Sequence, residues 1–300
     1  MRHRHLIVSS FIGLSVTLLN WWRLVAVQNN AGDFTWALRY AREMLAGRDP
    51  YLLPVSSAAI PYPLPAIFVA VPFAPLPNEL GGALFFGLST GLATYALLRL
   101  RGYVGLLPLL SHPFFEAFVT VQWSPAVMAA ALIPVLLPLT MCKPQIGLPV
   151  VLTRPSKAGL IGCVAFGLLT LAYYPTWPVV WLGQLGQFQR FIPLLTVAGF
   201  PLLLALLRWR GRDARLLLLM ALTPQRWFYD SLILWLIPRT RKEMVCTIVL
   251  SWFAGAWRVF SDSWPIPRVG LMAVLFYYLP MLVVVLARSK REGVVPTAHT

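Results

Sequence analysis

Acidic residues and cysteines are scarce in this 300-residue chain. Ten Asp and Glu residues compare with 25 Lys and Arg residues, which gives a formal net charge of +15. The three cysteines, Cys142, Cys163 and Cys246, are widely spaced beside or within apolar stretches, which favours buried thiols over disulfides. Four histidines form no recognisable metal cluster, and no glycine-rich phosphate loop is present. We therefore expect neither a metal nor a cofactor.

Apolar residues, by contrast, are abundant along nearly the whole chain. Hydrophobic residues make up 58% of it, charged residues 12%, and the mean hydropathy is +0.71. These values are typical of an integral membrane protein. The pattern predicts an all-α, polytopic helical bundle that forms a single transmembrane domain over residues 1–300. We expect about ten to twelve membrane segments, several of them half-length.

The basic residues lie at the ends of the apolar segments, as the positive-inside rule predicts for cytoplasmic loops. They lie at Arg2 and Arg4, Arg154 and Lys157, Arg208 to Arg215, Arg239 to Lys242, and Arg288 to Arg291. This placement indicates a multi-pass protein of the cell inner (plasma) membrane with both termini cytoplasmic, and it argues against nucleic acid as a partner. The start, "MRHRHLIVSSFIGLSVTLL", lacks a small-x-small cleavage site and predicts a retained first helix.

The longest polar stretch, residues 29–51, follows this first helix and therefore emerges outside. Residues 28–62 are predicted to form an external loop. Within it, Phe34, Leu38, Ala41 and Leu45 repeat every three or four residues, which predicts an amphipathic interfacial helix at 34–47 on the outer leaflet.

Several apolar pieces are short and interrupted by proline, which membranes tolerate only where protein or a water-filled cavity satisfies the backbone. Residues 63–77 are one such piece. If they cross the membrane, Arg99 and Arg101 fall on the external side. Either this piece is re-entrant or the positive-inside rule fails locally.

Asp33 stands at the start of the amphipathic helix and has two interpretations. It can be an N-cap that accepts hydrogen bonds from free backbone N–H groups. Alternatively, it is a functional carboxylate at the outer interface.

A family resemblance bears on this choice. "GDFTWALRYAREMLAGRDPY" followed by "IPYPLPAIFVAVPFAPLP" resembles the first external loop and second helix of glycosyltransferase family 87, polyprenol-phosphate-mannose-dependent α-mannosyltransferases with a GT-C fold. "KPQIGLPVVL" and "TPQRWFYDSLILWLIP" are similar, in order, to the family's Lys-Pro and Ser-Pro-x-Ser-Trp segments. Of the family's Gly-Gln-x-Asn segment only Gln122 remains. The histidine that often follows Ser-Pro-x-Ser-Trp is replaced, since Phe228, Tyr229 and Asp230 stand there.

The resemblance implies a transferase that moves a sugar, mannose first, from a polyprenyl-phosphate donor to a lipid or glycan acceptor at the external face. Asp33 would be the general base of a single inverting displacement. The donor phosphate needs cations or hydrogen-bond donors in the same cavity. The candidate binding residues are Lys143, Arg226, Gln122, Glu116, His112, Trp227 and Tyr62.

Some of these candidates also have structural interpretations. Lys143 and Arg226 can equally extend to lipid headgroups, and interfacial anchoring is favoured for Arg258. His112 and Glu116 are four residues apart on one predicted helix, where intramembrane ionisable pairs indicate a functional site.

Two other functions stay open. Broken helices and basic turns also suit a transporter or flippase of a lipid-linked or anionic solute, although no internal repeat is visible. A non-catalytic relative of the GT-C enzymes is the third hypothesis, because the histidine is missing and the chain is short.

Overall fold

The computed structural model describes residues 2–53, 61–187 and 189–288, and every regular element in these ranges is helical. Their one isolated antiparallel β-bridge joins Phe191 to Gln225. The all-helical prediction is confirmed. Residues 54–60 of the predicted 28–62 loop and the C-terminal residues 289–300 lie outside the described residues.

Most helices are short because the chain carries 26 prolines, many of which stand in the first turn of a helix, where the missing N–H has no intrahelical partner. The α-helices are α1 (Arg2–Ala26), α2 (Phe34–Leu45), α3 (Leu64–Ala70), α4 (Asn78–Arg101), α5 (His112–Thr120), α6 (Ser124–Ala130), α7 (Pro144–Thr153), α8 (Lys157–Tyr173), α9 (Trp177–Gln184), α10 (Arg212–Leu222), α11 (Arg241–Val259), α12 (Ile266–Ala273) and α13 (Leu279–Ala287). The 3₁₀ segments are η1 (Pro50–Leu52), η2 (Val71–Phe73), η3 (Gly102–Leu110), η4 (Pro134–Cys142), η5 (Leu185–Gln187), η6 (Pro193–Leu195), η7 (Phe200–Arg208) and η8 (Phe228–Leu236), and η9 (Val274–Tyr278) is a π-helical turn.

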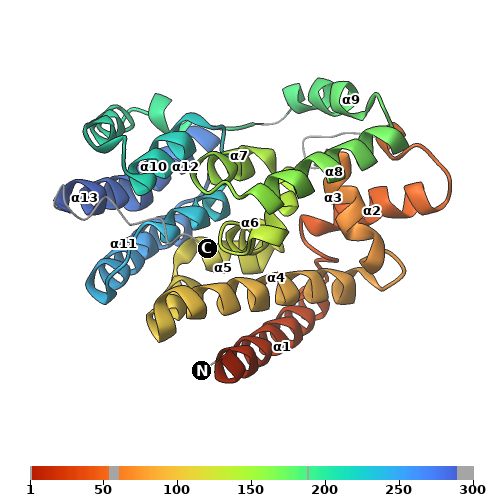
Figure 1. Cartoon of the computed structure of the whole chain (residues 1–300), viewed down its shortest axis with the longest axis horizontal. Helices are drawn as coiled ribbons and strands as arrows, with labels where there is room; N and C mark the ends of the chain where they lie inside the picture. Colours follow the sequence, from red (N-terminus) through yellow and green to blue (C-terminus); the bar gives the residue numbers. More distant parts are fainter. Residues whose placement is uncertain (1, 54–60, 188, 289–300) are drawn as a thin grey trace.

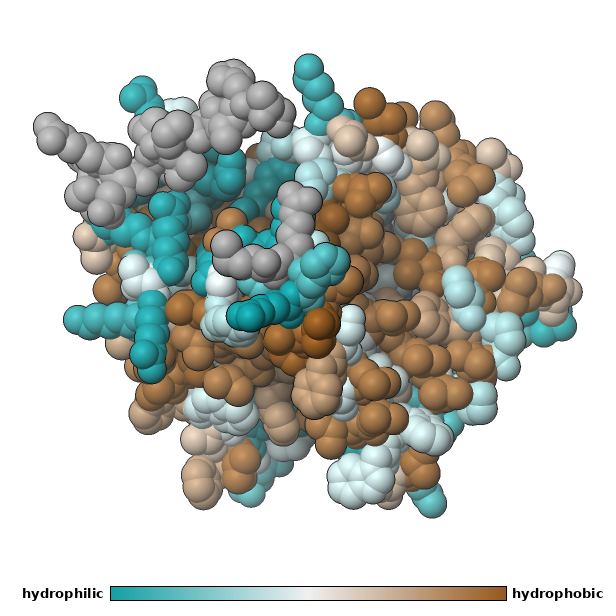
Figure 2. Space-filling model, turned by 60° about the horizontal axis from the view of Figure 1, so that its bottom comes forward, coloured by the Kyte–Doolittle hydropathy of each residue, from teal (hydrophilic) through white to brown (hydrophobic). Residues whose placement is uncertain are grey.

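Within the described residues, three helical stretches are long and apolar enough to cross a membrane: His3–Ala26, Asn78–Leu110 and Ile266–Ala287. A fourth span is present if α8 and α9, which meet at a bend of 92°, count as one. These stretches, and large apolar side chains exposed along α1 such as Phe11, Leu14 and Trp22, are those of a helical membrane protein. Figure 2 shows a face covered mainly by hydrophobic side chains, with the strongly hydrophilic ones gathered at its left. The number of ten to twelve segments stays a prediction.

Helices α1 and α4 pack side by side in antiparallel directions (Figure 1), and small residues let their backbones approach closely. A Cβ atom added at Gly87 would lie 2.7 Å from the Gly13 carbonyl oxygen and 2.9 Å from the Thr17 Cβ. One at Gly13 would lie 3.2 Å from the Gly91 Cα. A larger side chain at this contact would therefore push the helices apart.

Replacing Gly87 with Leu is expected to lower the free energy of unfolding by about 1–3 kcal/mol, because the added side chain overpacks the contact with Gly13 and Thr17. Denaturant unfolding in detergent measures the change. Gly183→Leu is the matched control, since a Cβ at Gly183 meets no atom within 4 Å. Equal stability of both variants would contradict close packing of α1 on α4.

Helix α2 begins where the sequence predicts and ends two residues earlier than the predicted 34–47 helix. Three of the four residues of its apolar stripe are buried against protein: the Phe34 ring stacks on Phe85 with centroids 4.0 Å apart, and Leu38 and Ala41 are fully buried, whereas Leu45 is exposed. Arg39, on the other side of the helix, is exposed. The buried part of the stripe thus packs α2 against α3 and α4.

Residues 64–77 return to the end of the molecule at which they enter. At their start, the Tyr62 hydroxyl donates to the Asp33 carbonyl oxygen over 3.3 Å. Just past η2, the Arg42 guanidinium donates to the Ala74 and Leu76 carbonyl oxygens over 2.8 and 2.9 Å, and Arg42 lies on the same helix that begins after Asp33. Both ends of the segment therefore lie beside α2. Of the two alternatives left open by the sequence, this geometry favours re-entry.

The basic helix ends gather at the opposite end of the bundle. Arg101, after the 24 residues of α4, donates to the Trp235 carbonyl oxygen over 3.1 Å and to that of Leu236. Arg288 at the end of α13 pairs with Asp213 and Glu243, which start α10 and α11. Arg101 therefore lies at the same end of the bundle as the other basic helix ends. The positive-inside rule predicts that such residues share one side of the membrane.

Candidate active site

Asp33 is fixed in the turn between α1 and α2. Gly32 adopts φ +56°, and a Cβ there would lie 2.6 Å from the Thr120 carbonyl oxygen, so glycine is needed for this approach. The Asp33 amide donates to that same oxygen over 2.9 Å. The turn is thereby held against the C-terminus of α5, which leads directly to Gln122.

The Asp33 carboxylate does not cap α2. The residue has helical backbone angles, and its side chain makes no capping hydrogen bond. Instead, Oδ2 accepts hydrogen bonds from the Gln122 amide Nε2, over 2.5 Å, and from the Tyr229 hydroxyl, over 3.3 Å. Of the two interpretations of Asp33, the N-cap is wrong.

Burial changes the acidity of this carboxyl. Loss of water contact raises the pKa of Asp33 above its usual range, and the charges of Arg226 and Lys143 oppose that rise. Hydrogen bonds from Tyr229 and Gln122 also favour the ionised form. A carboxylate whose pKa is raised takes up a proton more readily than one in water.

A chain of buried polar contacts extends from Asp33 through Gln122. Val121 has φ +53°, a conformation uncommon for a β-branched residue, and this places the Gln122 amide between Asp33 and Lys143. Lys143 Nζ donates to Gln122 Oε1 over 2.7 Å and pairs with Asp230 Oδ1 at 2.6 Å. The ammonium also lies 4.3 Å from the centre of the Tyr229 ring. Lys143 is therefore paired inside the protein and orients Gln122.

Asp230 also orders Arg226, because its Oδ2 accepts a hydrogen bond from the Arg226 backbone amide over 2.9 Å. Arg226 lies close enough to Asp33 for its charge to act on that carboxyl. Tyr62 is the last member of the group, because its hydroxyl donates a hydrogen bond to the Asp33 carbonyl oxygen. The structure thus brings Tyr62, Gln122, Lys143 and Arg226 together around Asp33.

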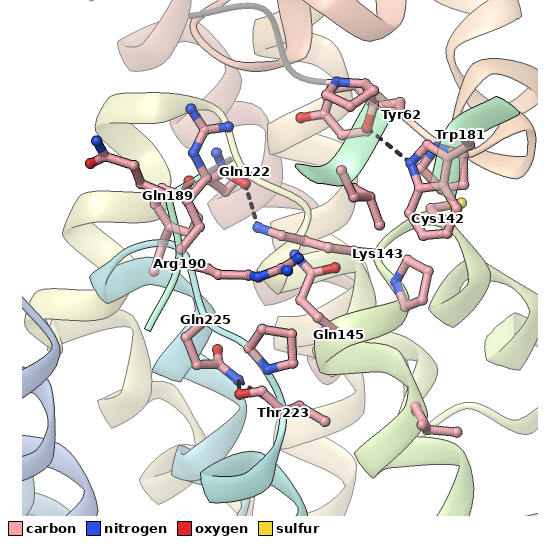
Figure 3. A pocket seen from close by; sticks show the side chains of 18 residues that line it. Tyr62, Gln122, Cys142, Lys143, Gln145, Trp181, Gln189, Arg190, Thr223 and Gln225 are labelled. Carbon is pink, nitrogen blue, oxygen red and sulfur yellow. Dashed lines mark hydrogen bonds between the residues drawn. The ribbon is translucent and has the colours of Figure 1, made fainter. Parts of the chain in front are cut away.

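A cavity of about 330 Å³ adjoins this cluster (Figure 3). Asp33 lies directly behind its wall, since Gln122 and Tyr229, the two side chains that donate to its carboxylate, belong to the lining. The lining residues are Pro61, Tyr62, Pro63, Gln122, Cys142, Lys143, Pro144, Gln145, Leu148, Trp181, Leu185, Gln189, Arg190, Thr223, Pro224, Gln225, Arg226 and Tyr229. The wall is mainly apolar and carries the cations Lys143, Arg190 and Arg226.

The remaining predicted residues form a second buried cluster that does not line the cavity. Glu116 Oε1 pairs with Arg258 and with His112 Nε2, at 3.2 Å for the histidine, and Oε2 accepts from the Trp227 indole over 3.0 Å. His112 Nδ1 lies 2.7 Å from the Tyr277 hydroxyl. Arg258, favoured for interfacial anchoring by the sequence, is a partner of Glu116. Glu116 thereby fixes Trp227, and with it the turn that carries the neighbouring Arg226.

Sequence reasoning missed Arg190, Gln145, Gln189, Gln225 and Trp181 as cavity residues. Gln145 and Gln225 directly follow the prolines of the "KPQ" and "TPQ" segments, so the spacing from Lys143 and toward Arg226 is the signal that could have found them. Arg190 offers no such signal, because the Phe191–Gln225 bridge brings it to the cavity. Among the residues the structure describes, no group of three or more His, Cys, Asp or Glu side chains could hold a metal ion.

The long apolar helices and the buried polar cluster are those of a helical membrane protein with a mainly apolar cavity that carries three cations, Lys143, Arg190 and Arg226. No protein-family model, no curated protein and no solved structure matches the chain. Any more specific function therefore rests on the side chains of the cavity.

Proposed function

We propose that the protein is a membrane glycosyltransferase that uses a sugar linked to a lipid phosphate, with Asp33 as the general base. The observation that carries the proposal is the Asp33 carboxylate itself. It caps no helix, it accepts hydrogen bonds from Gln122 and Tyr229, which line the cavity, and Arg226 and Lys143 lie nearby. The resemblance of residues 32–77 to glycosyltransferase family 87 supports the same chemistry.

The reaction would be a single displacement. Asp33 accepts the proton of the acceptor hydroxyl, and the acceptor oxygen forms a bond to the anomeric carbon of the sugar. The bond from that carbon to the phosphate oxygen breaks, and the lipid phosphate leaves with the electron pair, so the anomeric configuration inverts. Arg226 and Arg190 stabilise the phosphate as it gains negative charge. Lys143 is predicted as a phosphate contact, but its pairing with Asp230 favours a positioning role.

The lining of the cavity supports an amphiphilic donor. Leu148, Trp181, Leu185 and Pro144 offer apolar contact to a lipid chain, whereas Arg190 and Arg226 offer charge to its phosphate. Polyprenyl-phosphate mannose is the first donor to test, with a glycolipid or glycan end as acceptor. The basic helix ends would face the cytoplasm of an inner-membrane protein, so that the cavity opens on the external side.

Membranes that contain the protein provide the first test. They are incubated with radiolabelled polyprenyl-phosphate mannose and a set of lipid acceptors, beside membranes that lack the protein. Protein-dependent transfer supports the proposal. If lipid-linked sugar donors give no transfer but labelled lipid crosses sealed vesicles that contain the protein, the transporter hypothesis replaces it.

The pH dependence of transfer gives a second test. Transfer is expected to fall as the pH falls through the pKa of Asp33, at a pH above the ordinary value of 3.8, because burial favours the neutral acid and a protonated Asp33 cannot accept a proton. The same raised pKa means that the folded state binds this proton more tightly than the unfolded state. The contribution of Asp33 to stability is therefore present below its ordinary pKa and is lost as the pH rises through the raised one.

Initial rates and unfolding midpoints, each measured against pH on the same preparation, test both statements. Asp49→Asn should keep the wild-type rate profile, since Asp49 bonds Tyr51 and Tyr174 outside the cavity lining. A rate that stays constant down to the ordinary pKa of an aspartate would contradict the assignment of Asp33 as the base.

A further inference from the structure

Part of the cavity wall carries neutral polar side chains that the displacement does not use. They are Gln145, Gln189, Thr223 and Gln225, of which Thr223 and Gln225 lie on the side of the cavity away from Tyr62 and Gln122 (Figure 3). These amides and this hydroxyl come from three separate parts of the chain. Amide and hydroxyl groups both donate and accept hydrogen bonds, so they suit an uncharged polar ligand group.

Gln225 is the most firmly fixed of them and is fully buried. Its backbone N–H and C=O both pair with Phe191, over 2.7 and 2.9 Å respectively. Its side-chain Nε2 donates to the Thr223 hydroxyl over 3.1 Å and to the Met220 carbonyl oxygen over 3.3 Å. The nitrogen end of the amide is thereby identified, because the Met220 carbonyl oxygen, like that of Thr223 at 3.4 Å, can only accept.

The other end of the same amide, Oε1, has no hydrogen-bond partner within the described part of the chain. In Figure 3 this oxygen points away from Thr223, toward the side of the cavity where Arg190 lies. Buried amide oxygens in folded proteins are nearly always paired, and one that is fixed in place and unpaired in a cavity wall indicates a missing donor. A ligand in the cavity can supply it.

The charges of the cavity restrict what this donor can be. A phosphate at neutral pH mainly accepts hydrogen bonds and cannot satisfy a second acceptor. An ammonium could donate, but Lys143, Arg190 and Arg226 in the same lining disfavour a cationic ligand. A hydroxyl group is uncharged and donates readily. An anionic ligand that also carries hydroxyl groups, such as a sugar phosphate, meets both requirements.

We propose that Gln225 binds a sugar hydroxyl of the ligand through Oε1, and that it distinguishes the sugar-bearing lipid phosphate from the bare lipid phosphate. This inference rests on the proposed function for its choice of ligand. Gln225 is a binding residue, whereas Arg190 and Arg226 contact the phosphate. A site that hydrogen-bonds a hydroxyl rejects the analogue that lacks it, because the buried partner is then left unpaired.

The test measures binding rather than transfer. Two synthetic probes are compared on purified protein in detergent: mannose linked through phosphate to the short prenol citronellol, and citronellyl phosphate alone. The variants are Gln225→Met, which removes the amide at similar size, and Gln184→Met as the matched control. Its Nε2 likewise donates to a backbone oxygen, that of Tyr51, over 3.2 Å, and its Oε1 has no partner among the described residues, but Gln184 does not line the cavity.

Wild type and Gln184→Met are expected to bind the mannosyl probe more tightly than the bare phosphate. In Gln225→Met, affinity for the mannosyl probe should fall by about tenfold to a hundredfold, while affinity for citronellyl phosphate stays unchanged. Unchanged preference for the sugar in Gln225→Met, or no preference in wild type, overturns the inference. If Gln225→Met does not fold, monodeoxy mannosyl probes on wild type decide: one weakened position supports a bound hydroxyl, and uniform affinities overturn it.

The two proposals fail separately. A preference that depends on Gln225 without any transfer would leave the hydroxyl site in place and reject the transferase. Normal transfer, together with a preference for the mannosyl probe that does not depend on Gln225, would support the transferase and reject the hydroxyl site.

Discussion

Replacing Asp33 with Asn is expected to lower sugar transfer by about a hundredfold to ten-thousandfold, because an amide of the same size cannot take the proton of the acceptor hydroxyl. The amide can still meet the Tyr229 hydroxyl that donates to the carboxylate. Initial rates with radiolabelled polyprenyl-phosphate mannose, at matched amounts of purified protein, measure the effect. A variant rate close to that of wild type would remove Asp33 from the chemistry.

Asp49→Asn is the matched control for this experiment. Asp49 lies between α2 and η1, at the other end of α2 from Asp33, and its oxygens accept from the Tyr51 amide and from the Tyr174 hydroxyl, each over 2.8 Å. It should retain transfer. Asp33→Asn should also be at least as stable as wild type at neutral pH, since burial raises the pKa of Asp33 and the amide does not have to ionise there. A large loss of stability would instead indicate a structural role.

Replacing Lys143 with Met is expected to lower the free energy of unfolding by about 3–5 kcal/mol, because it leaves the Asp230 charge buried without its partner. The side chains of Lys143 and Asp230 are only 8% and 0% exposed, and 2.6 Å separates their charged atoms. Adding Asp230→Asn to the variant should restore part of the lost stability. Denaturant unfolding in mixed micelles measures all three proteins.

Lys157→Met is the control for the loss of a lysine, because Lys157 is exposed at the start of α8. It should change stability little. If both lysine variants lose the same stability, or if the double variant is less stable than Lys143→Met alone, then the pair with Asp230 does not hold this part of the site together.

The fold class and one half of the site could be predicted from the sequence for physical reasons. A segment that spans lipid must have all its backbone hydrogen bonds satisfied, and the long apolar stretches of this chain meet that requirement as helices. Four residues of the site could be identified from the sequence because each stands at a polar break between apolar helices: Asp33, Gln122, Lys143 and Arg226. Such breaks are few in this chain, and those of one end must lie near one another.

The other half depended on contacts between distant segments. No local pattern shows that Asp33 bonds Gln122 instead of capping α2, because that contact spans 89 positions of the chain. Glu116 looked like a ligand contact but is paired with Arg258, which is 142 positions away. Arg190 reaches the cavity only through the pairing of Phe191 with Gln225. Side-chain partners of this kind are set by packing.

Residues 64–77 return to the end of the molecule where they start, so they do not count as a membrane crossing. This determines the side of the membrane to which each later loop is assigned. Hydropathy counting would score this apolar stretch as one more crossing and would invert every later loop. The basic ends of α4, α7 and α13 would then be assigned to the compartment that holds Asp33. With this stretch left out of the count, an epitope inserted near Pro75 and one near Asn29 should be reached by antibody from the same side of a sealed vesicle.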